Sequence, residues 1–254
     1  MYVAIILGTA GSGKTMLTRS LADYLDDKGL DYAIMNLDPG VLTENLPYTP
    51  DIDVREFVRA EEVMNEYRLG PNGALIASMD LLANYIFDLQ QKILEIKPEY
   101  LLVDTPGQME IFAYRPSGPV IIENLFKMPD TRCAIVYLLD PFLCVYSPSA
   151  LLSALLLVES VYWRFELPML TALSKIDLLE EGVLEKLLKV IEEPSKLIVF
   201  KEIFQIKRDL SPLLAVIDKV QEIIAKDVIP VSAVTGEGIF DVFSNLLNVW
   251  SETG

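Results

Sequence analysis

A run of small residues that ends in a lysine is the first feature of this chain that could do chemistry. Residues 8–15 read Gly-Thr-Ala-Gly-Ser-Gly-Lys-Thr, which matches the pattern G-x-x-x-x-G-K-[ST] in full. Small residues let such a loop point its backbone N–H groups at an anion, at the start of a helix. Lys14 would reach the β- and γ-phosphates of a nucleoside triphosphate, and the Thr15 hydroxyl would ligate Mg²⁺. The residues predicted to hold the phosphates are Gly11, Ser12, Gly13, Lys14, Thr15 and Met16.

A carboxylate at the end of an apolar run is the second chemical feature. Residues 101–108 read Leu-Leu-Val-Asp-Thr-Pro-Gly-Gln, so that Asp104 ends a predicted buried strand. This is the Walker-B arrangement, which places a carboxylate beside Mg²⁺ directly or through a water molecule. The Gly107 N–H is placed to contact the γ-phosphate, and Gln108 is the residue type that orients an attacking water. Glu110 either supports that water or lies in solvent.

A third motif concerns the base of the nucleotide. Ser174-Lys175-Ile176-Asp177 follows a predicted strand and is similar to the guanine motif [NT]-K-x-D, with serine in its first position. The Asp177 carboxylate can accept from N1–H and N2–H₂ of guanine, a donor pair that adenine lacks, and the Lys175 stem can lie along the base. Ala233 follows the last predicted strand and would offer its N–H to guanine O6. We therefore predict that the site prefers GTP and GDP.

The composition excludes several other chemistries. The 254 residues include no histidine, which rules out a Ser-His-Asp triad, a histidine-ligated zinc site and a histidine general base. The two cysteines, Cys133 and Cys144, are too few for a disulfide framework and indicate a reducing compartment. Phosphate chemistry with carboxylates, amides, lysine and a metal is what remains.

The net charge bears on partners and location. With 21 Lys and Arg against 37 Asp and Glu, the chain has a net charge of −16, which disfavours direct binding of nucleic acid. Residues 141–158 carry no charge, but Pro141 and Pro148 interrupt them and the helical pattern continues into charged residues, which argues against a membrane span. The first residues have no basic leader. We expect a cytoplasmic protein.

Strands and helices alternate along the chain and would position these motifs. This alternation predicts an α/β fold, the three-layer α/β/α fold of P-loop NTPases with a mostly parallel sheet and helical insertions, formed by residues 1–254 as one domain. Short apolar runs predict buried strands at 3–7, 32–36, 101–103, 134–139, 169–173 and 228–231. Amphipathic patterns predict helices at 14–28, 73–96, 149–165 and 239–250.

Two segments exceed what a minimal α/β unit needs. The first is a helical insertion at about 53–73, in which the charge-rich residues 53–69 predict one or two short helices and Gly70-Pro71-Asn72-Gly73 follows them. Residues 182–227 form a second predicted helical insertion, rich in Leu, Ile, Glu and Lys.

Together these motifs resemble those of the GPN-loop GTPases, over essentially the whole chain. The resemblance rests on Asn36-Leu37-Asp38-Pro39-Gly40 after the second strand, on Gly70-Pro71-Asn72, and on Asp104-Thr-Pro-Gly-Gln108-x-Glu110-x-Phe112. In the larger class that also holds signal-recognition and MinD-like proteins, the aspartate corresponding to Asp38 holds waters of Mg²⁺ or the attacking water. The sequence departs from the family at Gly40, where alanine is more usual, and at Ser174.

The resemblance implies a homodimer in which Asn72 of one chain completes the partner's nucleotide site. It also implies a switch that takes part in assembling a large complex such as RNA polymerase, although the sequence names no protein client. The expected reaction is Mg²⁺-dependent hydrolysis of GTP, with Lys14 and Thr15 at the phosphates, Asp104 at the metal, and Asp38, Gln108 and Asn72 around the attacking water.

Two alternatives remain at this point. A P-loop kinase shares residues 8–15 but transfers phosphate to a nucleoside or polynucleotide, and it usually carries an arginine-rich lid. A nucleotide-gated scaffold would bind GTP and hydrolyse it only incidentally.

Overall fold

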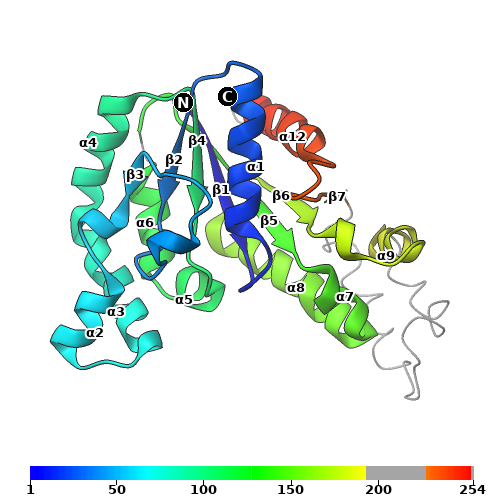
Figure 1. Cartoon of the computed structure of the whole chain (residues 1–254), viewed down its shortest axis with the longest axis horizontal. Helices are drawn as coiled ribbons and strands as arrows, with labels where there is room; N and C mark the ends of the chain where they lie inside the picture. The colour runs from blue at the N-terminus through cyan, green and yellow to red at the C-terminus, as the bar shows by residue number, and fades with distance from the viewer. Residues whose placement is uncertain (127, 193–226, 253–254) are drawn as a thin grey trace.

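In the part of the chain that the structure describes, seven strands form one parallel sheet at the centre of the molecule (Figure 1). The computed structural model describes residues 1–126, 128–192 and 227–252. The strand order is β3-β2-β4-β1-β5-β6-β7, and each neighbouring pair is parallel. The strands are β1 (Tyr2–Gly8), β2 (Tyr32–Asn36), β3 (Ile52–Asp53), β4 (Tyr100–Asp104), β5 (Arg132–Leu139), β6 (Met169–Leu173) and β7 (Val228–Pro230). The predicted α/β fold with a mostly parallel sheet is confirmed.

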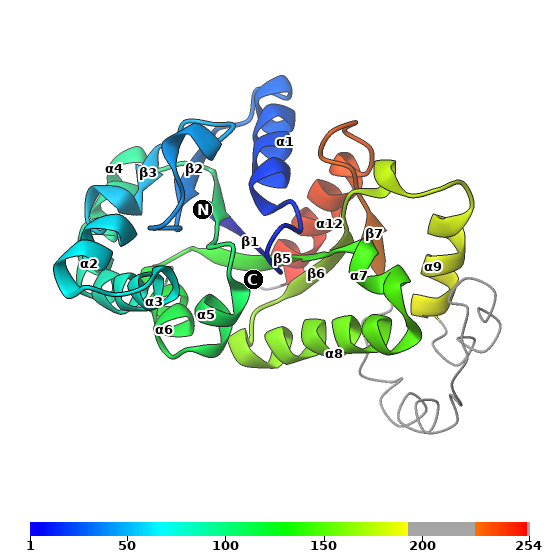
Figure 2. The same cartoon turned by 60° about the horizontal axis from the view of Figure 1, so that its bottom comes forward.

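Helices cover both faces of this sheet (Figure 2). Helices α1 and α12 pack on one face, where Ala4 and Ile6 of β1 point, and most of the others pack on the face of Val3 and Ile5. This alternation, with both sets buried, is what a parallel strand covered on two sides requires. The helices are α1 (Lys14–Asp27), α2 (Ala60–Tyr67), α3 (Pro71–Leu82), α4 (Ile86–Ile96), α5 (Met109–Tyr114), α6 (Ser117–Leu125), α7 (Pro141–Tyr146), α8 (Pro148–Phe165), α9 (Val183–Glu192) and α12 (Ile239–Glu252).

The register brings the chemical motifs to one edge of the sheet. Ile6 of β1 and Asn36 of β2 each lie opposite Asp104 of β4. Since the strands are parallel, the loops that follow β1, β2 and β4 leave the sheet side by side. The phosphate loop, the loop after Asp38 and the loop after Asp104 therefore meet.

The predicted helical segment at 73–96 is confirmed as helical, but it is not one continuous α-helix. The structure has α3, then a 3₁₀ turn at Ala83–Tyr85, then α4. Both helices bury apolar residues against the sheet, so their sequence pattern reads as one continuous helix even though the backbone turns between them. Helix α3 also begins at Pro71, so that Gly-Pro-Asn forms the start of a helix rather than a separate loop.

The two predicted insertions are described in part. Residues 53–69 hold a 3₁₀ turn at Val54–Glu56 and helix α2, as expected for one or two short helices. Helix α9 opens the second insertion, whose residues 193–226 lie outside the described residues. In the described parts of the chain, no helix combines the length and apolar character needed to cross a membrane.

Candidate nucleotide-binding site

The loop between β1 and α1 has the geometry that its sequence predicts. Gly13 has φ +98°, a left-handed conformation that glycine adopts without strain, and Lys14 starts α1. The Lys14 side chain is buried, and its Nζ donates to the carbonyl oxygens of Gly8 and Thr9, each at 3.0 Å. Burial lowers the pKa of Lys14, while the charges of Asp104 and Asp38 act in the opposite direction. The loop thus presents a cationic side chain at a helix N-terminus.

A cleft of about 240 Å³ opens above this loop. Its lining joins residues from the ends of β1, β2 and β4, as the sheet register requires. Of the predicted phosphate and metal residues, the lining includes Gly11, Gly13, Lys14, Thr15, Met16, Asp38, Asp104 and Gly107. Ser12, a residue of the same loop, is fully buried and does not line the cleft.

Buried polar atoms around the loop test whether phosphate and Mg²⁺ fit. Within the described residues, the hydroxyls of Thr9 and Ser12 and Oδ1 of Asp104 are buried without a hydrogen-bond partner. Hydroxyl groups suit phosphate oxygens, and a carboxylate with a free oxygen suits a cation. The Thr15 hydroxyl and the carboxylates of Asp104 and Asp38 are the hard oxygen donors that Mg²⁺ prefers.

The donor set is small, which also fits Mg²⁺. No group of three or more Asp, Glu, Cys or His side chains suited to a metal occurs in the part of the chain that the structure describes. Mg²⁺ is usually held by one or two carboxylates together with substrate phosphates and water, so this site needs no larger cluster.

Asp38 links the loops that follow β2 and β4. Its Oδ1 accepts from the Gly40 N–H at 2.8 Å, and its Oδ2 accepts from the Gly107 N–H at 3.4 Å. Burial raises the pKa of Asp38, although these two hydrogen bonds and Lys14 act against that rise. The Gly107 N–H, which the sequence assigned to the γ-phosphate, is therefore engaged with Asp38 in this structure.

Asn36, at the end of β2, holds this loop in place. It is fully buried, its Oδ1 accepts from the Asp38 N–H at 3.1 Å, and its Nδ2 donates to the Asp38 carbonyl at 3.2 Å and to Asp53 at 3.0 Å. The sequence places Asn36 at the start of the motif at residues 36–40 but assigns it no role, because its hydrogen bond to Asp53 depends on the pairing of β2 with β3.

Tyr48 contacts the predicted metal carboxylate directly. Its hydroxyl donates to Oδ2 of Asp104 at 2.6 Å, and both side chains are buried. Burial raises the pKa of Asp104, whereas the Tyr48 hydroxyl and Thr15 lower it. Burial and the neighbouring carboxylate also raise the pKa of Tyr48, which keeps the hydroxyl protonated. Tyr48 lies 56 residues from Asp104 in the sequence, and no local pattern signals the contact.

Asn72 and Gln108 meet beside the cleft but do not line it. The Gln108 Nε2 donates to Oδ1 of Asn72 within the same chain at 3.2 Å. Glu110 lies in the first turn of α5 and is exposed, although its charge acts on Lys14. Of the residues predicted to act on the attacking water, Asp38 therefore lines the phosphate cleft, whereas Gln108, Asn72 and Glu110 lie outside its lining.

The predicted base-binding residues lie along the loops after β6 and β7. The Ile176 N–H donates to the Val231 carbonyl, which joins these loops, and Asp177 is exposed beside them. Ala233 is half-buried. Ser174 is buried, and its hydroxyl donates to the Leu139 carbonyl at 3.2 Å, which links the end of β6 to β5. Its hydroxyl is therefore engaged within the protein, and Lys175 and Asp177 are the residues of the motif left to contact a base.

Lys175 is held by a residue that the sequence did not indicate. Its Nζ donates to Oδ2 of Asp140, at the end of β5, at 2.9 Å. Oδ1 of Asp140 accepts from the Phe142 N–H at 2.9 Å, which caps α7. The Lys175 stem passes beside Gly13, so Asp140 fixes this side chain between the base-binding loops and the phosphate loop.

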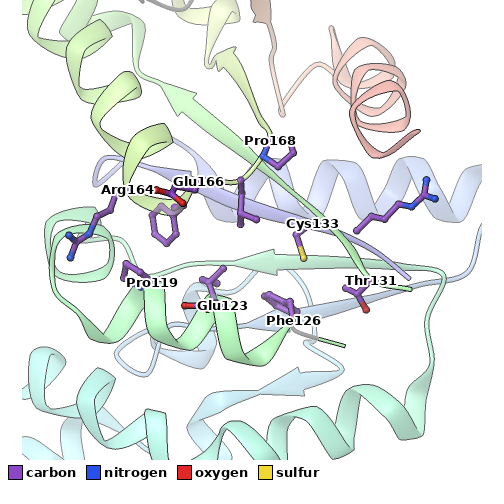
Figure 3. A pocket seen from close by; sticks show the side chains of 12 residues that line it. Pro119, Glu123, Phe126, Thr131, Cys133, Arg164, Glu166 and Pro168 are labelled. Atoms are coloured by element: carbon purple, nitrogen blue, oxygen red, sulfur yellow. The ribbon is translucent and has the colours of Figure 1, made fainter. Parts of the chain in front are cut away.

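A larger cleft of about 580 Å³ lies elsewhere, and Figure 3 shows its side chains. Pro119 and Glu123 of α6, Cys133 of β5, and Arg164 and Glu166 at the end of α8 line it. It lies at the amino ends of β5 and β6, the edge opposite the phosphate loop, and it contains none of the predicted site residues. The smaller cleft, which holds the predicted phosphate and metal residues, is therefore the candidate nucleotide site.

Comparison with known proteins gives consistent relatives. A family model described as "Conserved hypothetical ATP binding protein" matches residues 6–250. A GPN-loop GTPase of Pyrococcus abyssi is 40% identical over 193 residues, which cover 75% of this chain and 74% of that protein. A GPN-loop GTPase 2 homolog of Dictyostelium discoideum is 36% identical over 178 residues, which cover 70% of this chain.

The solved structures include one with the same overall fold. The crystal structure of a GTPase in apo form from Pyrococcus abyssi has a TM-score of 0.81 at 33% identity, and the match covers 98% of this chain and 97% of that one. The match spans 55% of the length of the GPN-loop GTPase 2 homolog of Dictyostelium discoideum. It spans 43% of the length of GPN-loop GTPase 1 of the same organism.

Proposed function

The chain belongs to the GPN-loop GTPase family, and from this premise we propose that it binds GTP with Mg²⁺ and hydrolyses it to GDP and phosphate. The observation that carries the proposal is the convergence of Lys14, Thr15, Asp38 and Asp104 on one cleft. Buried hydroxyls and a carboxylate oxygen without protein partners surround the same loop. These groups match the needs of a metal-bound triphosphate.

The residues would divide the work of an in-line attack by water. Lys14 and the N–H groups at the start of α1 bind the phosphates, while Thr15 and Asp104 hold the metal. Bound Mg²⁺ supplies charge neutralisation at the phosphate oxygens. Asp38 and Gln108 would orient the water, or Asp38 would hold a water of the metal. Glu110, whose charge acts on Lys14, would assist them or lie in solvent. Positioning and electrostatics dominate the rate of such reactions.

Guanine is the proposed base, although the matching family model is described as ATP-binding. Asp177 is exposed and carries a carboxylate that suits the N1–H and N2–H₂ donors of guanine. Lys175 is fixed by its ion pair with Asp140. The loop that carries Ala233 lies next to the loop that carries Asp177, because the Ile176 N–H donates to the Val231 carbonyl. A site that bound ATP equally well would contradict this assignment.

We also propose a homodimer in which Asn72 of each chain acts at the partner's phosphates, and a role as a nucleotide switch in assembling a larger protein complex. Asn72 supports this proposal by its place: it is exposed at the start of α3 and lies at the rim of the cleft, next to Gln108. An exposed amide there can reach a second chain. RNA polymerase is one candidate client.

Phosphate release with GTP and with ATP tests the reaction. We expect release from GTP alone, loss in Lys14→Ala, and no dependence on an added nucleoside or polynucleotide acceptor. Release that requires an acceptor would favour a kinase. Binding without turnover would favour a scaffold.

Mixing two inactive variants tests the position of Asn72. A 1:1 mixture of Lys14→Ala and Asn72→Ala, exchanged into random dimers, would regain about a quarter of the wild-type rate if Asn72 acts in trans, because half of the dimers would hold one intact site. No recovery, despite proven exchange, would mean that Asn72 acts on its own chain, where it contacts Gln108.

A further inference from the structure

Tyr48 makes a buried contact that the hydrolysis mechanism above does not use. We propose that Tyr48 is a positioning residue that fixes the Asp104 carboxylate so that its Oδ1 faces Mg²⁺. The inference rests on the proposed function, since it concerns the metal of that site. It assigns a role to the later part of the loop between β2 and β3, beyond the motif at residues 36–40.

The hydrogen bond divides the two oxygens of Asp104. Oδ2 accepts from the Tyr48 hydroxyl at 2.6 Å, whereas Oδ1 is buried and has no hydrogen-bond partner. A carboxylate with one oxygen bound to a fixed donor cannot rotate freely, so its other oxygen keeps one direction. That oxygen belongs to a residue that lines the phosphate cleft together with Thr15, the other predicted metal ligand.

The phenol ring of Tyr48 is itself fixed. It is 7% exposed and belongs to the apolar cluster that α1 forms with its face of the sheet. Because the ring is packed in this cluster, the Tyr48 hydroxyl cannot replace its hydrogen bond to Asp104 with one to water unless the ring leaves the cluster. The bond therefore holds the carboxylate in the folded protein whatever occupies the cleft.

The backbone around Tyr48 is tied on both sides. Arg19 of α1 donates to the Pro47 carbonyl at 3.1 Å. The Asp51 N–H donates to the Ile34 carbonyl, and the Ile34 N–H donates to Oδ2 of the Asp51 side chain, each at 2.8 Å. Groups that orient metal ligands in this way commonly change metal affinity 10- to 100-fold when they are removed. Tyr48 has the burial, the contact and the anchoring that such a role needs.

The test is nucleotide binding as a function of Mg²⁺. Fluorescent GDP is titrated into wild type and Tyr48→Phe, with EDTA and across a range of Mg²⁺ concentrations. Tyr48→Phe removes one oxygen and keeps the ring. We expect its Mg²⁺ midpoint to rise about tenfold or more, with unchanged affinity for GDP in EDTA.

Tyr100→Phe is the matched control. Tyr100 lies in the same apolar cluster and is similarly buried, but it is at the amino end of β4, far along the strand from Asp104. Its Mg²⁺ midpoint should equal that of wild type.

Three outcomes would overturn the inference. If Tyr48→Phe has the wild-type Mg²⁺ midpoint, the tyrosine does not position the metal ligand. If its melting temperature and its GDP affinity in EDTA both fall while the midpoint stays, its role is structural packing alone. If wild-type GDP binding does not respond to Mg²⁺ at all, the proposed metal site fails and this inference with it.

Discussion

The ion pair between Asp140 and Lys175 allows a perturbation that separates two effects. Asp140 uses Oδ2 for Lys175 and Oδ1 for the N–H of Phe142. Asp140→Asn keeps an oxygen for the helix cap but removes the charge that holds the lysine. Asp140→Ala removes both. The effect of Asp140→Asn therefore measures the contribution of the ion pair. The difference between Asp140→Ala and Asp140→Asn measures the contribution of the helix cap.

Burial sets the expected size of each effect. The Asp140 and Lys175 side chains are 12% and 29% exposed, so the pair lies between a surface pair and a buried one. Losing its charge should lower the free energy of unfolding by about 1–2 kcal/mol, and losing the cap as well by about 1 kcal/mol more. If fixed Lys175 supports the base, the Kd for GDP should rise about 5- to 30-fold in both variants.

Calorimetric titration with GDP and urea unfolding without nucleotide measure these two quantities. Asp23→Asn provides the control, because its ion pair with Arg19 is about half exposed on both sides and should contribute little. The reasoning is refuted if Asp140→Asn loses stability as expected but binds GDP within about twofold of wild type. Lys175 would then keep its place without the ion pair.

Two further predictions follow from the geometry of the site and of helix α5. Because burial raises the pKa of Asp38, its charged form destabilises the nucleotide-free protein at neutral pH, so Asp38→Asn should raise the melting temperature at pH 7 while abolishing GTP hydrolysis. This gain should shrink as the pH falls towards the raised pKa, where the wild-type carboxyl is protonated, and a lower melting temperature at pH 7 would contradict the argument. Gly118→Ala would put its Cβ 1.7 Å from the Phe112 carbonyl oxygen, which forces α5 and α6 apart. We expect a loss of about 1–3 kcal/mol in urea unfolding, against none for the roomier Gly73→Ala, and a stable Gly118→Ala would show that the helices separate easily.

The phosphate side of the site could be predicted from sequence because its residues are contiguous and their backbone geometry is local. The loop that ends in Lys14 and the strand that ends in Asp104 each carry a complete signal in a few residues, and the parallel register then brings them together. The apolar strands were equally clear, since both faces of each strand are buried.

The remaining contacts depend on tertiary structure that no local pattern encodes. Tyr48, Asn36 and Asp140 reach their partners across loops or between strands. The break between α3 and α4 was missed because both helices bury apolar faces, and the short helices α5 and α7 have six residues each, too few for a clear period. The trans role of Asn72 stays a prediction.

The position of β1 has a consequence for synthesis of the protein. The phosphate loop follows β1 directly, but the neighbours of β1 in the sheet are β4 and β5, which begin at Tyr100 and Arg132. At about 5–20 residues per second, a ribosome reaches those strands roughly 4 to 23 s after it has made the loop. The nascent loop therefore spends that interval on a strand without partners, and it can capture a nucleotide only after much of the sheet exists. Nucleotide added to a translating chain should consequently protect late intermediates and leave early ones unprotected.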